Sequence, residues 1–271
     1  MPAERTLGDF VPPMLAVTAP APFTSKDWWF EPKWDGFRAQ VSVSRHLTVR
    51  SRHGENLLDR FPGLAAVETG VAGPAVLDGE VVAWDAGRIN FHALAAGHGQ
   101  VILVAFDCLY APGGWLLDQP WTVRRRHLEA IVRPAGPLML CDGVAERGED
   151  LFRATGRLGF EGVVAKRQAS SYWPGRRSAD WRKFLHAEEV QVEVQVLTGR
   201  AGRWLGDVTA VGGWPPLACL AVPAPPGVGA PVEGQRIELG AGVLARVRHR
   251  GRTPSGRLRH AAFVAYGEAS R

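Results

Sequence analysis

Short apolar runs, broken at close intervals by glycine and proline, are the feature that most limits how this chain can fold. Over residues 1–186, strand-like runs at 75–84, 101–109 and 161–166 are interspersed with segments of helical character at 61–69, 122–131 and 149–158. Strands that alternate with isolated helices are typical of a mixed α+β domain. We therefore predict an α+β domain over residues 1–186.

The last part of the chain has a different pattern. It contains strand-like runs separated by turns rich in glycine and proline, at 190–197, 204–211, 217–222, 243–250 and 260–266. Short strands at this spacing are typical of a small barrel, and the OB-fold is the natural candidate. A polar connector at 186–189 precedes them, so we predict an all-β OB-fold domain over residues 187–271.

Three finer predictions concern local structure. Residues 1–25, rich in proline and alanine, are expected to form an extended lead-in packed across the first domain. Residues 61–69 are expected to form a short helix. Thr122 is expected to cap the helix that ends at Ile131. Arg124, Arg125 and Arg126 are expected on its solvent-exposed face, with a DNA contact as the alternative.

Composition excludes several classes of protein. The chain has no apolar run long enough to span a membrane and no signal-like segment at its start. Its cysteines, Cys108, Cys141 and Cys219, lie far apart and form no CxxC pair, so neither a disulfide framework nor a zinc ribbon is expected. A reducing cytoplasm is the expected compartment.

The charge of the chain favours a polyanionic partner. The formal net charge is +5. Between Leu239 and Val264 there is no acidic residue. The same segment accumulates arginines at positions 246, 248, 250, 252, 257 and 259. Arginines without a counter-charge are typical of a surface that follows phosphates. The predicted DNA-binding residues are Arg246, Arg248, Arg250, Arg257 and Arg259.

Lysine is rare in this sequence, although lysine and arginine together number 32. The four lysines are Lys26, Lys33, Lys166 and Lys183. An arginine stays protonated, whereas a lysine amine can lose its proton and attack carbon or phosphorus. Lys33 follows a strand-like run and is followed by Gly36, which permits a tight turn or the close approach of a ligand. Lys33 is therefore a candidate nucleophile.

Two carboxylates interrupt the apolar run at 75–84. Asp78 and Glu80 flank a glycine there. Burying an unpaired charge is costly. Either the run contains a bulge whose acids form salt bridges, or its carboxylates face a cleft.

Six short motifs occur in order along the chain. The first is K-x-D-G-x-R at 33–38. The others are S-R-H-G at 51–54, L-D-G-E at 77–80, F-D-C-L at 106–109, E-G-V-V-A-K at 161–166 and W-R-K at 181–183. The set resembles the motifs of ATP-dependent DNA ligases in their short bacterial two-domain form. The opening V-P-P-M-L-A is also similar to that of the ligase module in bacterial non-homologous end-joining proteins.

The resemblance implies a fold and a reaction. The fold is an α+β nucleotidyltransferase (ATP-grasp-like ligase) domain followed by an all-β OB-fold domain. In the reaction, Lys33 attacks the α-phosphate of ATP and becomes adenylylated. The adenylate passes to the 5′-phosphate of a nick, and the 3′-hydroxyl then displaces AMP. Each step is an in-line displacement at phosphorus, so catalysis depends mainly on positioning and charge neutralisation.

The resemblance also implies roles for individual residues. Glu80 and Glu161 are expected to bind Mg²⁺ or Mn²⁺. Asp35 is expected to orient the lysine or the waters of the metal. Within the nucleotide site, Phe106 is expected to stack on adenine and Glu31 to contact the edge of the base. The full set of predicted nucleotide-binding residues is Glu31, Arg38, Arg52, Glu80, Phe106, Lys166 and Lys183.

Two departures from the family pattern concern the first step. Position 185, where the family usually has a second lysine, is Leu185. The R-x-D-K motif expected near the C-terminal end is absent, because the sequence there reads G-E-A-S-R. We expect either slow self-adenylylation or replacement of the missing contact by Arg257 or Arg259.

Three functions remain open at this stage. The first is a DNA ligase that acts on nicked double-stranded DNA in repair or end joining, as a monomer, with DNA-repair proteins as candidate partners. The second is an RNA ligase or a capping-type guanylyltransferase, which share K-x-D-G. F-D-C-L and the bacterial-style opening favour the DNA ligase. The third is a degenerate module that only binds nicks, against which the three motif lysines argue.

Overall fold

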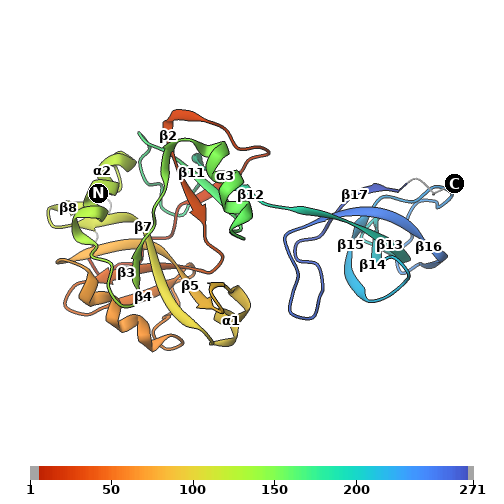
Figure 1. Cartoon of the computed structure of the whole chain (residues 1–271), viewed down its shortest axis with the longest axis horizontal. Coiled ribbons are helices and arrows are strands. Elements are labelled where there is room, and N and C mark those ends of the chain that lie inside the picture. Colours follow the sequence, from red (N-terminus) through yellow and green to blue (C-terminus); the bar gives the residue numbers. More distant parts are fainter. Residues whose placement is uncertain (1–5, 268–271) are drawn as a thin grey trace. The chain divides into compact units, whose positions relative to one another are not determined.

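A computed structural model describes residues 6–267 of the chain (Figure 1). The chain divides into two compact units, between Leu185 and His186. The assignment of these units as an adenylation domain over 1–186 and an OB-fold domain over 187–271 stays a prediction. Among the described residues, no helix is both long enough and apolar enough to cross a membrane.

The described strands of the first unit form two sheets. The larger sheet has the order β4-β3-β5-β7-β8, with β6 paired to β5 and β9 to β7. Its strands are β3 (Phe37–Val43), β4 (Thr48–Ser51), β5 (Ala75–Asp85), β6 (Arg88–Ile89), β7 (Gln100–Ala111), β8 (Gly114–Trp115) and β9 (Leu138–Leu140). The smaller sheet has the order β1-β12-β11-β2-β10. Its strands are β1 (Leu15–Thr18), β2 (Ser25–Lys33), β10 (Val144–Glu146), β11 (Gly162–Arg167) and β12 (Arg177–Leu185).

The two long central strands of the larger sheet, β5 and β7, are buried on both faces. On β5, Leu77 and Val81 face one core, whereas Val76 and Val82 face another. The second core also contains Met14, Tyr172 and Trp181 from the segments that meet the smaller sheet. A strand covered on both sides is expected to be almost continuously apolar, which explains the run at 75–84. The second core thus joins the two sheets.

Among the described residues of the first unit, four helical segments accompany the sheets. They are the 3₁₀ helix η1 (Pro62–Gly70) and the α-helices α1 (Phe91–Ala96), α2 (Trp121–Ile131) and α3 (Gly148–Arg157). Pro120, not Thr122, precedes α2 as its N-cap, so the predicted cap was wrong. The short α1 was not predicted. Its cap is Asn90, whose side chain accepts hydrogen bonds from the backbone N–H groups of His92 and Ala93.

The prediction that three consecutive arginines of α2 face solvent was wrong for two of them. Arg124 is fully buried and forms two parallel hydrogen bonds to Asp107 of β7, at 2.8 and 2.9 Å. Arg125 is also buried and donates to the Cys141 carbonyl oxygen at 2.6 Å. Only Arg126 is exposed. The partners lie in other elements, so the local sequence did not reveal the burial.

The second unit is one antiparallel sheet with the order β15-β14-β13-β16-β17. The strands are β13 (Glu188–Arg200), β14 (Arg203–Thr209), β15 (Pro216–Val222), β16 (Arg236–His249) and β17 (Ala262–Tyr266). The outer strands β15 and β17 also approach each other, and Leu258 donates its backbone N–H to the Leu217 carbonyl oxygen. The sheet is therefore strongly curled around a core that contains Val192, Trp204 and Val247.

Candidate active site

A pocket lies between the two sheets of the first unit. It has about 800 Å³ of empty space, including the part that is open to solvent. The smaller sheet contributes residues of β1, β2, β11 and β12, and the larger sheet contributes residues of β3, β5 and β7. The lining residues are Leu15, Ala16, Glu31, Pro32, Lys33, Trp34, Arg38, Arg52, Glu80, Phe106, Val164, Lys166, Arg177, Trp181 and Lys183.

The structure brings the predicted nucleotide-site residues together in this pocket. All seven predicted nucleotide-binding residues and Lys33 line it. Glu161 does not line the pocket, but it forms an ion pair with Lys33. The sequence positions span more than a hundred residues, so this grouping depends on the pairing of the strands and not on local sequence.

Lys33 ends β2, opposite the start of β11. Because Lys33 pairs with Gly162 in the register of the two strands, Glu161 lies beside it. The Lys33 Nζ is 2.5 Å from the Glu161 Oε2, and both side chains are about a quarter exposed. The following turn requires Gly36, because a Cβ there would lie 2.1 Å from the Val81 carbonyl oxygen. The absence of a side chain at Gly36 therefore allows this turn to pack closely against the backbone of β5.

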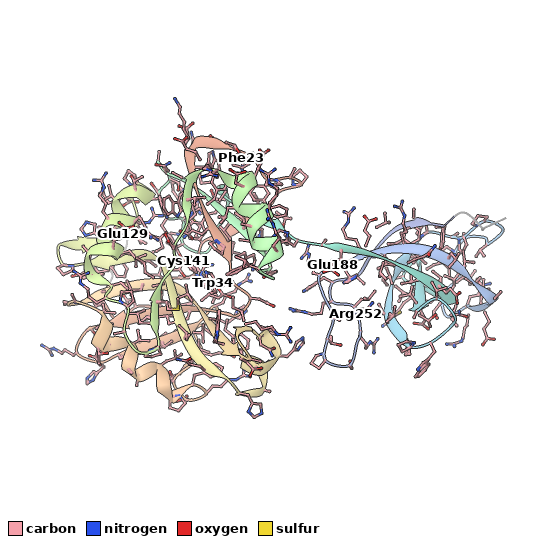
Figure 2. All side chains as sticks on the ribbon, in the orientation of Figure 1. Phe23, Trp34, Glu129, Cys141, Glu188 and Arg252 are labelled. Carbon is pink, nitrogen blue, oxygen red and sulfur yellow. The ribbon has the colours of Figure 1, made fainter. Side chains whose placement is uncertain are left out.

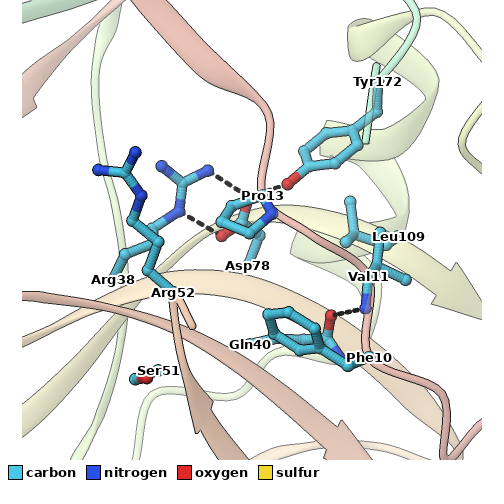
Figure 3. Close-up of a pocket in the computed structure, with 10 residues that line it drawn as sticks. All are labelled: Phe10, Val11, Pro13, Arg38, Gln40, Ser51, Arg52, Asp78, Leu109 and Tyr172. Atoms are coloured by element: carbon cyan, nitrogen blue, oxygen red, sulfur yellow. Dashed lines mark hydrogen bonds and ion pairs between the residues drawn. The ribbon is translucent and has the colours of Figure 1, made fainter. Parts of the chain in front are cut away.

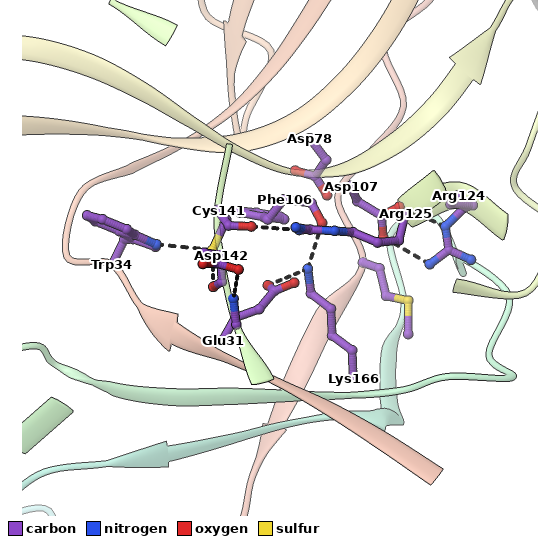
Figure 4. A network of polar contacts seen from close by, with 12 residues as sticks. Glu31, Trp34, Asp78, Phe106, Asp107, Arg124, Arg125, Cys141, Asp142 and Lys166 are labelled. Atoms are coloured by element: carbon purple, nitrogen blue, oxygen red, sulfur yellow. Dashed lines mark hydrogen bonds and ion pairs between the residues drawn. The ribbon is translucent and has the colours of Figure 1, made fainter. Parts of the chain in front are cut away.

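A buried ion pair forms the inner wall of the pocket (Figure 4). Lys166 Nζ lies 2.7 Å from the Glu31 Oε2 and donates to the Phe106 carbonyl oxygen at 2.9 Å. Burial raises the pKa of the Glu31 carboxyl group, although Lys166 opposes the rise. The second oxygen of Glu31, Oε1, is buried without a hydrogen-bond partner in the structure. An unsatisfied buried acceptor of this kind is costly and suits a ligand donor.

Arg38 is held in a second ion pair, by Asp78 of β5. Its Nε and Nη2 donate to the two Asp78 oxygens at 2.5 and 2.6 Å. The strand pairing of β5 with β7 shifts register between Asp78 and Gly79. Both alternatives suggested by the sequence thus occur, since Asp78 forms a salt bridge at an irregular position and Glu80 lines the pocket.

Phe106 presents little of its ring to a ligand. It is 9% exposed, and the Arg38 Cζ and the Lys166 Nζ lie 4.7 and 4.4 Å from its centroid. Trp181 packs against it in an edge-on arrangement. Trp34 is the other aromatic side chain of the lining, and its indole N–H donates to the Cys141 sulfur at 3.3 Å (Figure 4). Figure 2 labels both residues in the first unit.

Glu80 lies in an electrostatically unusual position. Burial raises the pKa of its carboxyl group to about 7, while Lys33 and Arg38 oppose the rise. Asp78 and Glu161 add to it, because each brings a further negative charge. An added cation would stabilise the charged form of the Glu80 carboxylate beside these acidic neighbours. Mg²⁺ binds through one or two carboxylates plus phosphates and waters, so the chemistry of Glu80 and Glu161 fits that ion. No cluster of three metal-ligand side chains occurs among residues 6–267.

Arg177 is a pocket residue that the sequence predictions missed. It lies on β12 with Trp181 and Lys183, and its Nη1 donates to the Ala16 carbonyl oxygen at 2.5 Å. The sequence could have indicated this residue. Positions 177, 181 and 183 are separated by even numbers, and such positions share one face of a strand.

The predicted DNA-binding arginines all lie in the second unit. Arg246 and Arg248 are exposed on β16, on the face opposite the buried Ala245 and Val247 side chains. The expectation that they have no counter-charge was wrong. Glu189 of β13 accepts from Arg248 at 2.9 Å and from Arg246 at 3.5 Å. The cause is the register of the sheet, which pairs Glu189 with Arg248.

The remaining arginines extend beyond the end of β16. The backbone N–H of Arg250 donates to the Arg259 carbonyl oxygen, and Arg252 pairs with Leu258. Arg250, Arg252, Arg257 and Arg259 therefore belong to one hairpin. The R-x-D-K motif, absent from the sequence, was expected after this hairpin, and residues 268–271 there lie outside the described part.

Comparison with known structures gives the class of this fold. The crystal structure of the ligase domain of LigD from M. tuberculosis is 27% identical, covers 95% of this chain and 95% of its own, and has a TM-score of 0.62. A mycobacterial DNA ligase D in complex with ATP and MES has the same identity and TM-score and covers 96% of each chain. The fold is therefore that of an ATP-dependent DNA ligase domain.

The family follows from the sequence comparisons. The family model described as ATP dependent DNA ligase domain matches residues 13–184. The multifunctional non-homologous end joining protein LigD of Mycolicibacterium smegmatis is 36% identical over 191 residues, which is 68% of this chain and 25% of that protein. The chain belongs to the ATP-dependent DNA ligase family, and the resemblance to the end-joining ligase module is confirmed. The chain spans about a quarter of the length of the LigD protein from M. smegmatis.

Proposed function

We propose that this chain is an ATP-dependent DNA ligase that seals nicks through a lysyl-AMP intermediate on Lys33, in repair or end joining. The observation that carries the proposal is the position of Lys33. Its amine lies in a pocket with Lys166, Lys183, Arg38 and Arg52, next to the carboxylate of Glu161. Family membership and the likeness to a ligase domain solved with ATP support ATP as the nucleotide.

The proposed first step makes a P–N bond and breaks a P–O bond. The Lys33 amine leaves Glu161, loses its proton and attacks the α-phosphate of ATP, and pyrophosphate departs. The AMP then passes to the 5′-phosphate of the nick, which frees Lys33. In the last step the 3′-hydroxyl attacks the activated phosphate, and AMP leaves. The surrounding cations neutralise the phosphate charges, which is the main requirement of in-line displacement.

Within the nucleotide site, Glu31 and Lys166 act as one fixed unit. Their mutual ion pair and the bond to the Phe106 carbonyl hold the Lys166 ammonium in place. We assign the unpartnered Glu31 Oε1 to an N–H group of adenine. Phe106 is assigned to the face of the base, and its low exposure requires neighbouring side chains to shift when the base binds.

Glu80 and Glu161 are the residues that would hold a divalent metal. Bound there, Mg²⁺ would supply positive charge beside the phosphates and favour the neutral form of a nearby amine. The raised pKa of Glu80 is consistent with a carboxylate that needs such a cation.

For the second unit we propose an OB-fold that binds nicked double-stranded DNA through its arginines. The curled antiparallel sheet and its position after the ligase domain support this assignment. Arg250, Arg257 and Arg259 belong to the hairpin and Arg246 and Arg248 to the face of β16. Arginines in this number bind phosphates without reading sequence.

Sealing of nicked substrates tests the proposal. We expect the wild-type protein with ATP and Mg²⁺ to join a nicked DNA duplex, and Lys33→Ala to be inactive at every step that starts from ATP. Supplying a nick that already carries a 5′-adenylate should restore sealing by Lys33→Ala, because only the first two steps need the amine. Preferential sealing of a nicked RNA duplex would contradict the DNA ligase and favour an RNA ligase.

A further inference from the structure

Arg38 reaches the pocket with its guanidinium already oriented by the protein. The N–H groups of Nε and Nη2 donate to Asp78 and to the Met14 carbonyl oxygen. An arginine has five N–H donors, of which two are on Nη1. The Nη1 group has no protein partner among the described residues. Because the Arg38 side chain is 20% exposed and lines the pocket, Nη1 is the part left for a ligand.

The orientation of Arg38 depends on Asp78, and Asp78 is itself held by a residue outside the six motifs. The Tyr172 hydroxyl donates to the Asp78 Oδ2 at 2.7 Å (Figure 3). It also accepts from the Met14 N–H at 3.0 Å. Tyr172 and Asp78 are each 2% exposed. Both hydrogen-bonding functions of the hydroxyl are therefore used in a site closed to water.

The segment that carries Tyr172 is fixed on both sides. The backbone N–H of Tyr172 donates to the Leu117 carbonyl oxygen at 2.7 Å. Two residues earlier, the Ser170 carbonyl oxygen accepts from the buried Arg124 at 2.9 Å. The hydroxyl therefore stands on a rigid support, which is what a group that positions another side chain requires.

We propose that Tyr172 is a positioning residue for the nucleotide site. Its hydroxyl fixes the Asp78 carboxylate, which in turn holds the fork of Arg38 so that Nη1 faces the bound nucleotide. The ring of Tyr172 also packs against Trp181. Replacement by phenylalanine keeps that packing and removes only the hydroxyl. The inference rests on the proposed function, because it concerns the binding of ATP before Lys33 is adenylylated.

The test is the rate at which labelled AMP is transferred from ATP to the protein, measured over a range of ATP concentrations. Tyr172→Phe should lower the ratio of maximal rate to half-saturating ATP concentration about tenfold, the size expected for a lost hydrogen bond to a charged group. Tyr266→Phe is the matched control, because its hydroxyl also donates a hydrogen bond, in this case to the Pro223 carbonyl oxygen, but lies in the second unit. Its ratio should equal that of the wild type.

Measuring the effect of Tyr172→Phe in an Arg38→Lys variant as well distinguishes a positioning role of Tyr172 from a general structural role. Arg38→Lys keeps the charge but cannot form the fork. If Tyr172 acts through Arg38, Tyr172→Phe should change the ratio less than twofold in this background. An equal loss in both backgrounds would overturn the proposal, as would an unchanged ratio in Tyr172→Phe alone. If Tyr172→Phe does not fold, Asp78→Asn takes its place in the same cycle with the same expected outcomes. Absence of labelling in the wild-type protein would instead overturn the proposed function.

Discussion

At the scale of single residues, the first unit contains ion pairs that are almost fully buried. Lys166 and Glu31 form one such pair, and Arg124 and Asp107 form another, with all four side chains 3% exposed or less. Removing charges from water is costly, and only good geometry with further hydrogen bonds offsets the cost. Lys166 and Arg124 each donate in addition to a backbone carbonyl oxygen. The pairs therefore tie separate strands and loops to each other.

The pair of Arg124 and Asp107 gives a test of this account. Arg124→Ala leaves the Asp107 carboxylate buried without its cation, so we expect it to lower the free energy of unfolding by about 3–5 kcal/mol. The matched control is Arg126→Ala, two positions along the same helix, whose side chain is exposed. It should change the free energy by less than about 0.5 kcal/mol. Urea unfolding followed by tryptophan fluorescence measures both, and equal effects would show that the buried pair does not stabilise the fold.

At the scale of elements, the strand register decides which charges meet. The arginines of β16 were expected to have no counter-charge, because the acid that faces them lies about sixty positions earlier on β13. The register brings Glu189 against Arg248 and Arg246. These arginine side chains are 58% exposed, so the pairs add little to stability but reduce the positive charge offered to DNA.

Removal of this counter-charge should strengthen DNA binding. We expect Glu189→Gln to bind a nicked duplex roughly two- to fivefold more tightly at low salt, because Arg246 and Arg248 are then released to contact phosphates. Glu188→Gln is the matched control, since it changes the net charge equally, but Glu188 lies near His249 and, among the described residues, forms no ion pair with an arginine. Fluorescence anisotropy at several salt concentrations measures both, and the difference between them should shrink as salt rises. Weaker binding by Glu189→Gln than by Glu188→Gln would contradict the assignment of the β16 face.

Comparison of the predicted with the observed strands and contacts shows how much of the structure the sequence predicts. Apolar runs and turn residues located β5, β7 and the strands of the second unit, because those patterns are local. The motif lysines and carboxylates were expected to share a site, and Lys33, Glu80 and Lys183 do lie around one pocket. The burial of Arg124 and the contact of Glu189 were beyond prediction, since each depends on a partner in another element. The strand β16 begins seven residues before its expected start, where Gly240 and Gly242 masked it.

At the scale of the whole molecule, a ligase-family domain precedes a curled all-β unit. The family match ends at residue 184, and the likeness to a solved ligase domain covers both units. The residues proposed for the chemistry lie in the first unit, and the arginines proposed for DNA lie in the second. This division suits a reaction whose first substrate is a nucleotide and whose second is a polymer. All of it depends on whether Lys33 forms a covalent bond to AMP.

Mass spectrometry of the protein after incubation with ATP and Mg²⁺ tests that claim most directly. We predict an AMP adduct that peptide mapping places on Lys33, and its loss, together with formation of a sealed strand, when nicked DNA is added. Lys33→Arg should carry no adduct, because a guanidinium is a poor nucleophile. An adduct on another residue, or no adduct in a folded protein that binds ATP, would contradict the account.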